Sequence, residues 1–273
     1  MPEGPEVKKI AASLTKELMP FELGKLWLST KPLRKRVDEV ILKTRENTMV
    51  EKVEAYGKIL FFYSAGQPVL TAQMGMTGQL KLVNSATDIE PHTHIRWKIK
   101  NSTKELRYVD IRRFGLVDVC DERRRREILS KLGPDPFNLN RAGRLKIIAS
   151  IQKSSRAIKE ILLDQSVVCG VGNIYASESL FLARINPMKK GLDINEKKCQ
   201  DLIKAVVLVL QQSYRNGGTT FSDYVDAQGN KGDNFSQLKV FKRESKPCLV
   251  CVRPVIRIKQ SGRSTFFCDF CQS

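Results

Sequence analysis

The first clear pattern in the chain is a helical one close to its N-terminus. Apolar residues at Val7, Ile10, Leu14 and Leu18 recur at intervals of three and four, the spacing that places side chains on one face of an α-helix. The sequence therefore predicts an amphipathic helix that starts near Glu6. Such a helix would hold the residues that precede it on a rigid body.

From about residue 24 to residue 119 the pattern changes to short runs of β-forming residues. Turn signals separate these runs, and the clearest of them are 59–63, 69–72, 80–83, 94–99 and 106–109. Many short strands at close spacing are typical of a β-sandwich or a β-barrel. We therefore expect a β-rich domain in the first half of the chain.

The run Gly133-Pro134-Asp135-Pro136 interrupts the chain and marks a domain boundary. Just before it, the four consecutive arginines at 123–126 fit a solvated helix face. Beyond it the periodicity is helical, with predicted helices around 157–162, 175–181 and 202–210. The last of these is expected to be capped by Asn195 and to end at Gly217-Gly218. The predicted fold class is α+β, in two domains.

Charge narrows the range of partners. The 273 residues include 47 Lys and Arg against 29 Asp and Glu, a net charge of +18. Such an imbalance points to a polyanion, either nucleic acid or an anionic membrane surface. No apolar run approaches the roughly 20 residues that span a bilayer, and no signal-peptide pattern opens the chain. A protein that works on nucleic acid, without a membrane partner, is the better interpretation.

Four of the seven cysteines form two closely spaced pairs, Cys248-x2-Cys251 and Cys268-x2-Cys271, with sixteen residues between them. This spacing is typical of a four-thiolate zinc site, and four thiolates leave no open position for catalysis. A thioredoxin-like redox motif is the competing interpretation, but it requires one CxxC in a βαβ setting. We therefore predict one structural zinc ion in a reduced compartment.

The residues between the two cysteine pairs predict a β-hairpin. Ile256 and Ile258 alternate with cationic residues, Ser261-Gly262 gives a turn, and the chain returns from Arg263. A hairpin this small has little core, so the metal would supply much of its folding free energy. Arg263 at the hairpin tip is a candidate phosphate contact.

The run Gly170-Val171-Gly172-Asn173 lies between two predicted helices. Glycines allow backbone N–H groups to approach a ligand, and a helix N-terminus favours an anion. An ordinary helix–helix turn and a helix-turn-helix reader of the major groove are the alternatives. With the basic hairpin in the same domain, a phosphate-binding turn is the better interpretation.

Removal of Met1 would expose the secondary amine of Pro2, next to Glu3. An α-amine with a pKa near ~8 is a better nucleophile at neutral pH than a lysine with a pKa near ~10.4. A neighbouring carboxylic acid can handle the protons while such an amine attacks an electrophilic carbon. The alternative is a plain helix start, because proline and acidic residues both suit a first turn. The first six residues alone favour that alternative.

Several segments together carry a family resemblance. They are Met1-Pro2-Glu3-Gly4-Pro5-Glu6-Val7, Tyr56-Gly57-Lys58, Met74-Gly75-Met76-Thr77-Gly78, Asp110-Ile111-Arg112-Arg113-Phe114-Gly115, Leu163-Asp164-Gln165, residues 170–178 and the terminal cysteine pairs. In this order they resemble the formamidopyrimidine-DNA glycosylase and endonuclease VIII superfamily over essentially the whole chain.

The resemblance implies a specific architecture. It consists of an N-terminal β-sandwich with flanking helices and a C-terminal helix-two-turn-helix bundle that ends in a zinc-ribbon β-hairpin. On this sequence the expected divisions are a catalytic sandwich domain at 1–132, a hinge at 133–141, a helix-two-turn-helix domain at 142–245 and a zinc ribbon at 246–273.

The resemblance also implies catalytic roles. Pro2 would attack C1′ of the damaged nucleoside and form a Schiff base, and an enzyme that keeps Met1 is expected to be inactive. Glu3 would be the general acid and Glu6 an accessory acid. Lys58 would transfer protons and position the lesion phosphate.

The remaining implied residues contact DNA. Asn173, beside Gly172, would hold the phosphates that flank the lesion, and Arg263 would share this role as part of the active site. Met76, Arg112 and Phe114 would fill the space left by the extruded nucleotide. His92 and Arg156 complete the set, although the family usually has lysine near Arg156.

The implied activity is that of a base-excision-repair DNA glycosylase with AP lyase activity. It would remove 8-oxoguanine and formamidopyrimidines and cut the strand by β,δ-elimination. Gly4 is more typical of the endonuclease VIII branch, so an oxidised-pyrimidine glycosylase is the alternative. A non-catalytic zinc protein that binds damaged DNA is a third hypothesis.

The expected partner is double-stranded DNA that contains oxidised bases. No organic cofactor and no oligomer are expected, so the chain should act as a monomer with one zinc ion. The absence of a signal peptide and the reduced cysteines favour a bacterial cytoplasm, at the nucleoid, or a nucleus if the source is eukaryotic.

Overall fold

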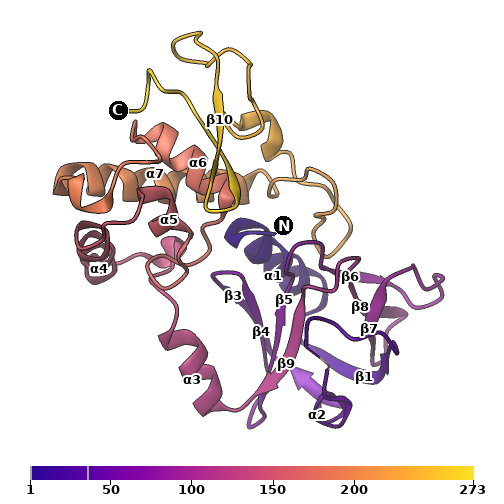
Figure 1. The fold of residues 1–273 in the computed structure, drawn as a ribbon. Helices are drawn as coiled ribbons and strands as arrows, with labels where there is room; N and C mark the ends of the chain where they lie inside the picture. Colours follow the sequence, from indigo (N-terminus) through magenta and orange to yellow (C-terminus); the bar gives the residue numbers. More distant parts are fainter. Residues whose placement is uncertain (1, 36) are drawn as a thin grey trace. The chain divides into compact units, whose positions relative to one another are not determined.

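The structure is a computed structural model that describes residues 2–35 and 37–273 (Figure 1). Met1, whose removal the predicted chemistry requires, lies outside the described residues. The chain forms two compact units. The first comprises the residues up to Leu129 together with Asn216–Phe235, and the second comprises Ser130–Arg215 and Ser236–Ser273.

The first unit contains two antiparallel sheets. One has the strand order β2-β1-β7-β8-β6 and the other has the order β3-β4-β5-β9. The strands are β1 (Phe21–Leu28), β2 (Thr48–Val50), β3 (Lys52–Tyr56), β4 (Ile59–Tyr63), β5 (Val69–Gln73), β6 (Gln79–Asn84), β7 (Thr93–Ile99), β8 (Lys104–Val109) and β9 (Leu116–Cys120). Apolar side chains from both sheets share one hydrophobic core, so the predicted β-sandwich is confirmed.

Three helices accompany these sheets: α1 (Gly4–Leu18), α2 (Glu39–Lys43) and α3 (Glu122–Ser130). Helix α1 packs against β3 and β4. Its Val7, Ile10 and Leu14 side chains are completely buried, as the apolar periodicity predicts. Burial of each such side chain contributes about 1.5–3 kcal/mol, which fixes the helix to the sandwich. Helix α3 has no buried residue, and its arginines form a solvated face.

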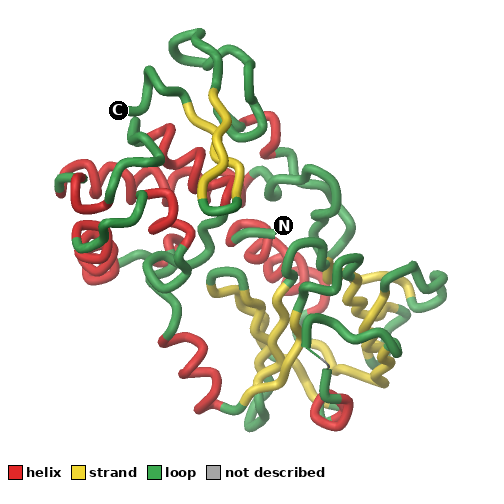
Figure 2. The backbone as a smooth tube through the Cα atoms, in the orientation of Figure 1, coloured by secondary structure: helices red, strands yellow, loops and turns green. Residues whose placement is uncertain are grey.

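The second unit is helical apart from one hairpin, whereas the other described strands lie in the first unit (Figure 2). Its α-helices are α4 (Arg141–Gln152), α5 (Ile158–Leu163), α6 (Asn173–Leu182) and α7 (Glu196–Arg215), and its hairpin is β10 (Ile256–Gln260) with β11 (Arg263–Phe267). Short 3-10 turns lie at Pro136–Asn138 and Gly191–Asp193, and a third at Asn234–Gln237 spans the boundary between the units. Helix α6 packs against α5, α7 and β11.

Most predicted elements are confirmed, and the differences have local causes. Asn195 caps α7, since its side-chain oxygen accepts from the backbone N–H of Lys198 at 2.9 Å. Helix α4 was not predicted, because its buried residues Ile147, Ile148 and Ile151 form only a short apolar stripe. No helix in the described part of the chain is long and apolar enough to cross a membrane.

The segment 216–235 belongs to the first unit, although it lies within the range 142–245 that was predicted for the helix-two-turn-helix domain. Tyr224 and Ala227 are buried in the core of the sandwich. The backbone N–H of Leu82 in β6 donates to the carbonyl of Ala227 at 2.7 Å. The chain therefore leaves the helical unit after α7, contributes to the sandwich and returns for the zinc hairpin.

Candidate active site and metal centre

The start of the chain is held in one conformation by the first turn of α1. Glu3 is the N-cap of this helix, and it forms a capping box with Glu6. The backbone N–H of Glu3 donates to Oε2 of Glu6 at 2.8 Å. Pro2, Glu3 and Glu6 are all buried. Because a capping box satisfies backbone donors at the helix start, Pro2 is attached to an ordered first turn.

The second oxygen of Glu6 contacts a distant part of the first unit. Oε1 of Glu6 accepts from the backbone N–H of Thr219 at 2.8 Å. The preceding residue, Gly218, has φ +93°, and a Cβ atom there would lie 2.7 Å from the ring of Tyr224 and 3.1 Å from Glu6. The two carboxylate oxygens of Glu6 thus accept hydrogen bonds from two separate segments, one from the backbone N–H of Glu3 and one from that of Thr219.

Further hydrogen bonds order the 216–235 segment internally. The hydroxyl of Tyr224 donates to the Gly217 carbonyl at 3.0 Å. The backbone N–H of Gly232 donates to Thr220 Oγ1 at 2.9 Å. The side-chain amide of Asn234 donates to Thr219 Oγ1 at 2.9 Å. The segment is therefore a closed loop whose base adjoins the N-terminus of α1.

Lys58 lies at the tip of the β3–β4 hairpin. Tyr56 pairs with Ile59, which leaves Gly57 and Lys58 as a two-residue turn. Gly57 has φ +57°, a conformation that favours glycine at this turn position. Since α1 packs against β3, the hairpin that carries Lys58 is anchored to the helix that carries Pro2.

Four predicted DNA contacts lie on loops of the first unit. Met76 is 39% exposed and Phe114 is 46% exposed. The guanidinium of Arg112 stacks over the ring of Phe114 at 4.6 Å. His92 is exposed and has φ +65°. The backbone at Gly75 approaches Phe114 so closely that a Cβ atom there would lie 2.6 Å from it, which brings the Met76 and Phe114 loops together.

In the second unit the structure brings Asn173 to the zinc hairpin. Gly172 is the N-cap of α6 and Asn173 is its first residue. One hydrogen of the Asn173 amide is donated to the carbonyl of Ser264, the neighbour of Arg263, at 2.9 Å. A helix N-terminus, an amide with a second hydrogen and an exposed arginine form a set of anion donors.

Lys159 was not identified from the sequence, although it belongs to the same arrangement. It is 1% exposed and its ammonium donates to the Ser264 carbonyl at 3.0 Å and to Thr265 Oγ1 at 2.7 Å. It therefore fixes the start of β11 against α5. The sequence feature that could have identified it is a lysine within the apolar helical run that contains Ile158 and Ile161.

Arg156 lies in a different setting from the other predicted contacts. Its guanidinium pairs with the carboxylate of Asp164 at 3.0 Å, on a partly exposed surface. Hydrogen bonds from Ser166, with a further contribution from Arg156, lower the pKa of Asp164. An exposed pair of this kind contributes at most about 1 kcal/mol, so Arg156 can exchange this partner for a stronger anion.

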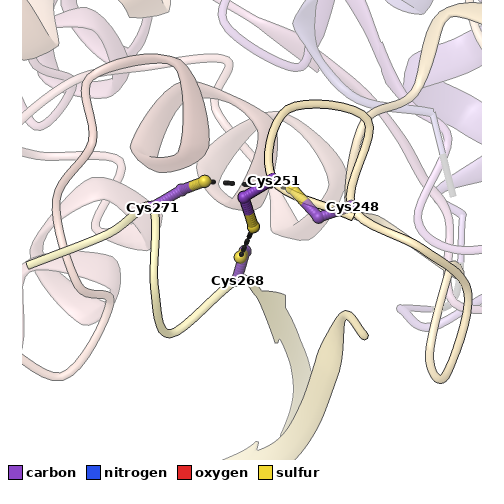
Figure 3. A group of neighbouring side chains, drawn as sticks. All are labelled: Cys248, Cys251, Cys268 and Cys271. Carbon is purple, nitrogen blue, oxygen red and sulfur yellow. Dashed lines mark hydrogen bonds between the residues drawn. The ribbon is translucent and has the colours of Figure 1, made fainter. Parts of the chain in front are cut away.

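The four paired cysteines converge on one point (Figure 3). Their sulfur atoms all lie within 4.8 Å of one another, with Cys248 and Cys271 at 3.9 Å and Cys251 and Cys268 at 3.5 Å. Four sulfurs bound tetrahedrally at ~2.3 Å from zinc lie roughly 3.8 Å apart. A disulfide would require about 2.05 Å. The site therefore fits one zinc ion with four thiolate ligands, as predicted.

The hairpin between these cysteines has its turn at the predicted residues, Ser261 and Gly262. Ile256 pairs with Phe267 and Gln260 pairs with Arg263, and the turn residues Ser261 and Gly262 have φ +46° and +75°. Arg263 is exposed at the end of β11. The zinc ion and the contacts to Lys159 and Asn173 hold this arginine on a rigid support.

Comparisons with known protein families agree with this geometry. Residues 1–117 match the family model of the formamidopyrimidine-DNA glycosylase N-terminal domain. Residues 132–225 match the formamidopyrimidine-DNA glycosylase H2TH domain. Residues 245–273 match a zinc finger found in FPG and IleRS. The three matches cover the sandwich, the helices and the metal site.

Individual relatives are similar over their full length. The formamidopyrimidine-DNA glycosylase of Listeria monocytogenes is 36% identical over 285 residues, covering 100% of both chains. That of Desulforamulus reducens is 35% identical over 277 residues, covering 100% of this chain and 99% of the relative. The crystal structure of MutM (Fpg) from Thermus thermophilus is 31% identical with a TM-score of 0.87, covering 99% of this chain and 98% of that one.

A solved complex is also similar. The wild-type Lactococcus lactis Fpg bound to DNA that contains N7-benzyl-Fapy-dG is 28% identical with a TM-score of 0.88, covering 99% of each chain. The matches to the glycosylase N-terminal and H2TH domains, followed by the zinc finger, place the chain among the DNA glycosylases. The chain belongs to the formamidopyrimidine-DNA glycosylase family, whose activity is on oxidised purines.

Proposed function

We propose that this protein is a bifunctional enzyme that removes 8-oxoguanine and formamidopyrimidines from double-stranded DNA and then cuts the abasic site. The observation that carries the proposal is the placement of Pro2 and Glu3 directly before the first turn of a helix whose apolar side chains Val7, Ile10 and Leu14 are completely buried. A nucleophile and an acid on such a support keep their mutual geometry, which reduces the entropy that the reaction must lose.

The reaction begins at C1′ of the damaged nucleoside. The secondary amine of Pro2 forms a bond to C1′ as the glycosidic bond breaks, and the amine loses its N–H proton while the departing base takes up a proton. Glu3 protonates the ring oxygen, the C1′–O bond opens and an iminium (Schiff base) to Pro2 remains. The iminium acidifies the C2′ proton, whose loss expels the 3′-phosphate. A second elimination expels the 5′-phosphate and completes the β,δ sequence.

Two further groups support this chemistry. Lys58 sits on a hairpin anchored to α1, where it positions the lesion phosphate and exchanges protons. Glu6 holds Glu3 through its backbone N–H, and we assign it as an accessory to the acid. The zinc ion is structural, because its four thiolates leave no open coordination position, and it takes part in no step.

DNA is held by phosphate contacts from the second unit. Asn173 and Arg263 bind the phosphates that flank the lesion, Gly172 opens the helix N-terminus beside them, and Arg156 joins them by exchanging its pair with Asp164. The net charge of +18 favours association with any duplex through the release of counterions. We expect a monomer in the bacterial cytoplasm.

The damaged nucleotide must leave the stack before it reacts, which costs a few kcal/mol. Met76, Arg112 and Phe114, exposed on neighbouring loops, fill the space that it leaves. His92 contacts the backbone nearby. The 216–235 segment, whose base is bonded to Glu6, covers the extruded base.

Borohydride trapping tests the proposal. A duplex with 8-oxoguanine opposite cytosine should give a covalent adduct, and peptide mapping should place it on Pro2 of a chain that has lost Met1. Glu3→Gln should abolish trapping on 8-oxoguanine but leave it on a preformed abasic site. Glu17→Gln, an acid at the far end of the same helix, is the matched control.

Two results would overturn the proposal. A chain that binds damaged DNA but gives no adduct is a non-catalytic binding protein. A chain that excises thymine glycol in strong preference to 8-oxoguanine is an enzyme of the endonuclease VIII type.

A further inference from the structure

Asp110 is a buried carboxylate that follows β8, and its exposed fraction is 0%. Its Oδ1 accepts from the hydroxyl of Thr77 at 2.6 Å and from the backbone N–H of Arg112 at 3.2 Å. Its Oδ2 accepts from the backbone N–H of Gly115 at 2.7 Å. The side chain thus connects the loop that carries Met76 to the loop that carries Arg112 and Phe114.

The backbone of Asp110 reaches a third loop. Its N–H donates to the carbonyl of His92 at 3.0 Å, and its carbonyl accepts from the backbone N–H of Arg113 at 3.3 Å. The same carbonyl accepts from Nε2 of the buried His94 at 3.0 Å. One residue therefore contacts the loop that carries Met76, the loop that carries His92 and the loop that carries Arg112 and Phe114.

Two of these loops have backbone conformations that need such support. His92 has φ +65° and Arg113 has φ +57°, in a region that residues other than glycine adopt reluctantly. Such conformations persist where the surroundings over-determine them, and backbone hydrogen bonds with Asp110 contribute to that constraint at both residues. Gly115 leaves no room for a side chain, since a Cβ atom there would overlap the hydroxyl oxygen of Tyr108 and lie 3.0 Å from Asp110 Oδ2.

We propose that Asp110 is a positioning residue that holds the three loops in register, so that Met76, Arg112 and Phe114 enter the DNA stack together as the damaged nucleotide leaves it. The inference rests on the proposed function of those three side chains. It assigns to Asp110 no contact with DNA and no role in the chemistry of Pro2.

A carboxylate suits this role because both of its oxygens are acceptors only. In Asp110→Asn one oxygen becomes an NH2 group. That group must face either the N–H of Gly115 or the donors of Thr77 and Arg112. On that side, the NH2 group and a backbone N–H of the loop then face each other as two donors, and the hydrogen bond is lost. The size of the side chain is unchanged.

The test compares two substrates. Wild type and Asp110→Asn are assayed for single-turnover excision of 8-oxoguanine from a duplex, and for borohydride trapping on a single-stranded abasic site, which has no stack to fill. A small misplacement of positioned groups can reduce the rate by about 100-fold, and a loss of this order is expected on the duplex. Trapping on the single strand should be unchanged. In a duplex with 2-aminopurine opposite the lesion, wild type should change the fluorescence of that base when side chains enter the stack. Asp110→Asn should bind the same duplex without this change.

Two variants separate positioning from stability. Thr77→Val removes one donor to Asp110 and should reproduce part of the duplex defect, whereas Thr77→Ser should restore activity. Thr71→Val removes a buried hydroxyl of β5 that donates to the Asp118 carbonyl at 3.1 Å, and it should leave both reactions unchanged.

Equal loss on both substrates, or no loss in Asp110→Asn and Thr77→Val, would overturn the inference. If wild type itself gives no adduct on abasic DNA, the proposed function has failed and not the assignment of Asp110.

Discussion

Oε1 of Glu6 accepts a hydrogen bond from the backbone N–H of Thr219 at 2.8 Å, although 213 residues separate the two in sequence. The other oxygen of the same carboxylate holds the N–H of Glu3. One buried side chain therefore connects the helix start that carries Pro2 to the base of the 216–235 segment. In the proposed reaction, the helix start carries the nucleophile Pro2, and the 216–235 segment covers the extruded base.

This arrangement predicts a substrate-dependent effect of Glu6→Gln. The amide can accept only through its oxygen, so either the Glu3 or the Thr219 contact is lost. A hydrogen bond to a charged group contributes about 1.5–3 kcal/mol, so excision of 8-oxoguanine should fall by at least tenfold. Processing of a preformed abasic site, which has no base to cover, should fall less. Single-turnover rates on the two substrates measure this, and an equal loss on both would contradict it.

Removal of zinc should unfold the β10–β11 hairpin and release Arg263. The hairpin has little core of its own, so its folding free energy depends on the metal. Cys251→Ser should lower the zinc content and abolish hydrogen-exchange protection at 256–267 while the sandwich keeps its protection. Cys199→Ser is the control, because Cys199 lies outside the cluster and a hydroxyl can still donate to the Ile194 carbonyl. Full protection of 256–267 in Cys251→Ser would refute the dependence on zinc.

Arg263→Ala should reduce the salt dependence of DNA binding. Loss of one phosphate contact lowers the slope of log K against log salt concentration by about 0.9. Arg257→Ala offers a matched control on the same hairpin, since Arg257 pairs with Glu244 at 3.3 Å. Fluorescence anisotropy at several salt concentrations gives both slopes. Identical slopes for Arg263→Ala and wild type would exclude the phosphate contact.

Glu105 makes the stability of the sandwich depend on pH. It is completely buried and binds Arg96 through two hydrogen bonds of 2.9 Å. Burial by itself would raise the pKa of Glu105, but hydrogen bonds from Arg96 and Arg107 hold that pKa below its ordinary value. Because the folded-state pKa is lowered, the contribution is complete above the unfolded value of about 4.3 and is lost as pH falls through the folded value.

Glu105→Gln should therefore destabilise the protein by about 3–5 kcal/mol at pH 7, because it leaves the buried Arg107 and the partly exposed Arg96 without their counterion. The difference from wild type should shrink as pH falls below about 4. Denaturant unfolding at pH 7 and at successively lower pH measures this. A difference that stays constant with pH would show that Glu105 is not the titrating group.

Part of this protein is determined by patterns local to the sequence. Val7, Ile10 and Leu14 predict α1 because a helix face repeats every three or four residues, and the β runs are predicted for the corresponding reason. The zinc site follows from two CxxC pairs, since each pair places two sulfurs within reach of one ion. The order of the motifs from Pro2 to Cys271 was sufficient to identify the family.

The β runs by themselves left a sandwich and a barrel open, and the family resemblance was needed to favour the sandwich. Other features were decided only by the tertiary structure. The return of residues 216–235 to the first unit, the burial of Lys159 against Ser264 and the three loops joined by Asp110 were not predicted. Each depends on contacts between segments far apart in sequence. Such contacts leave no periodic signal, because a single polar residue satisfies buried donors or acceptors wherever the packed chain brings them together.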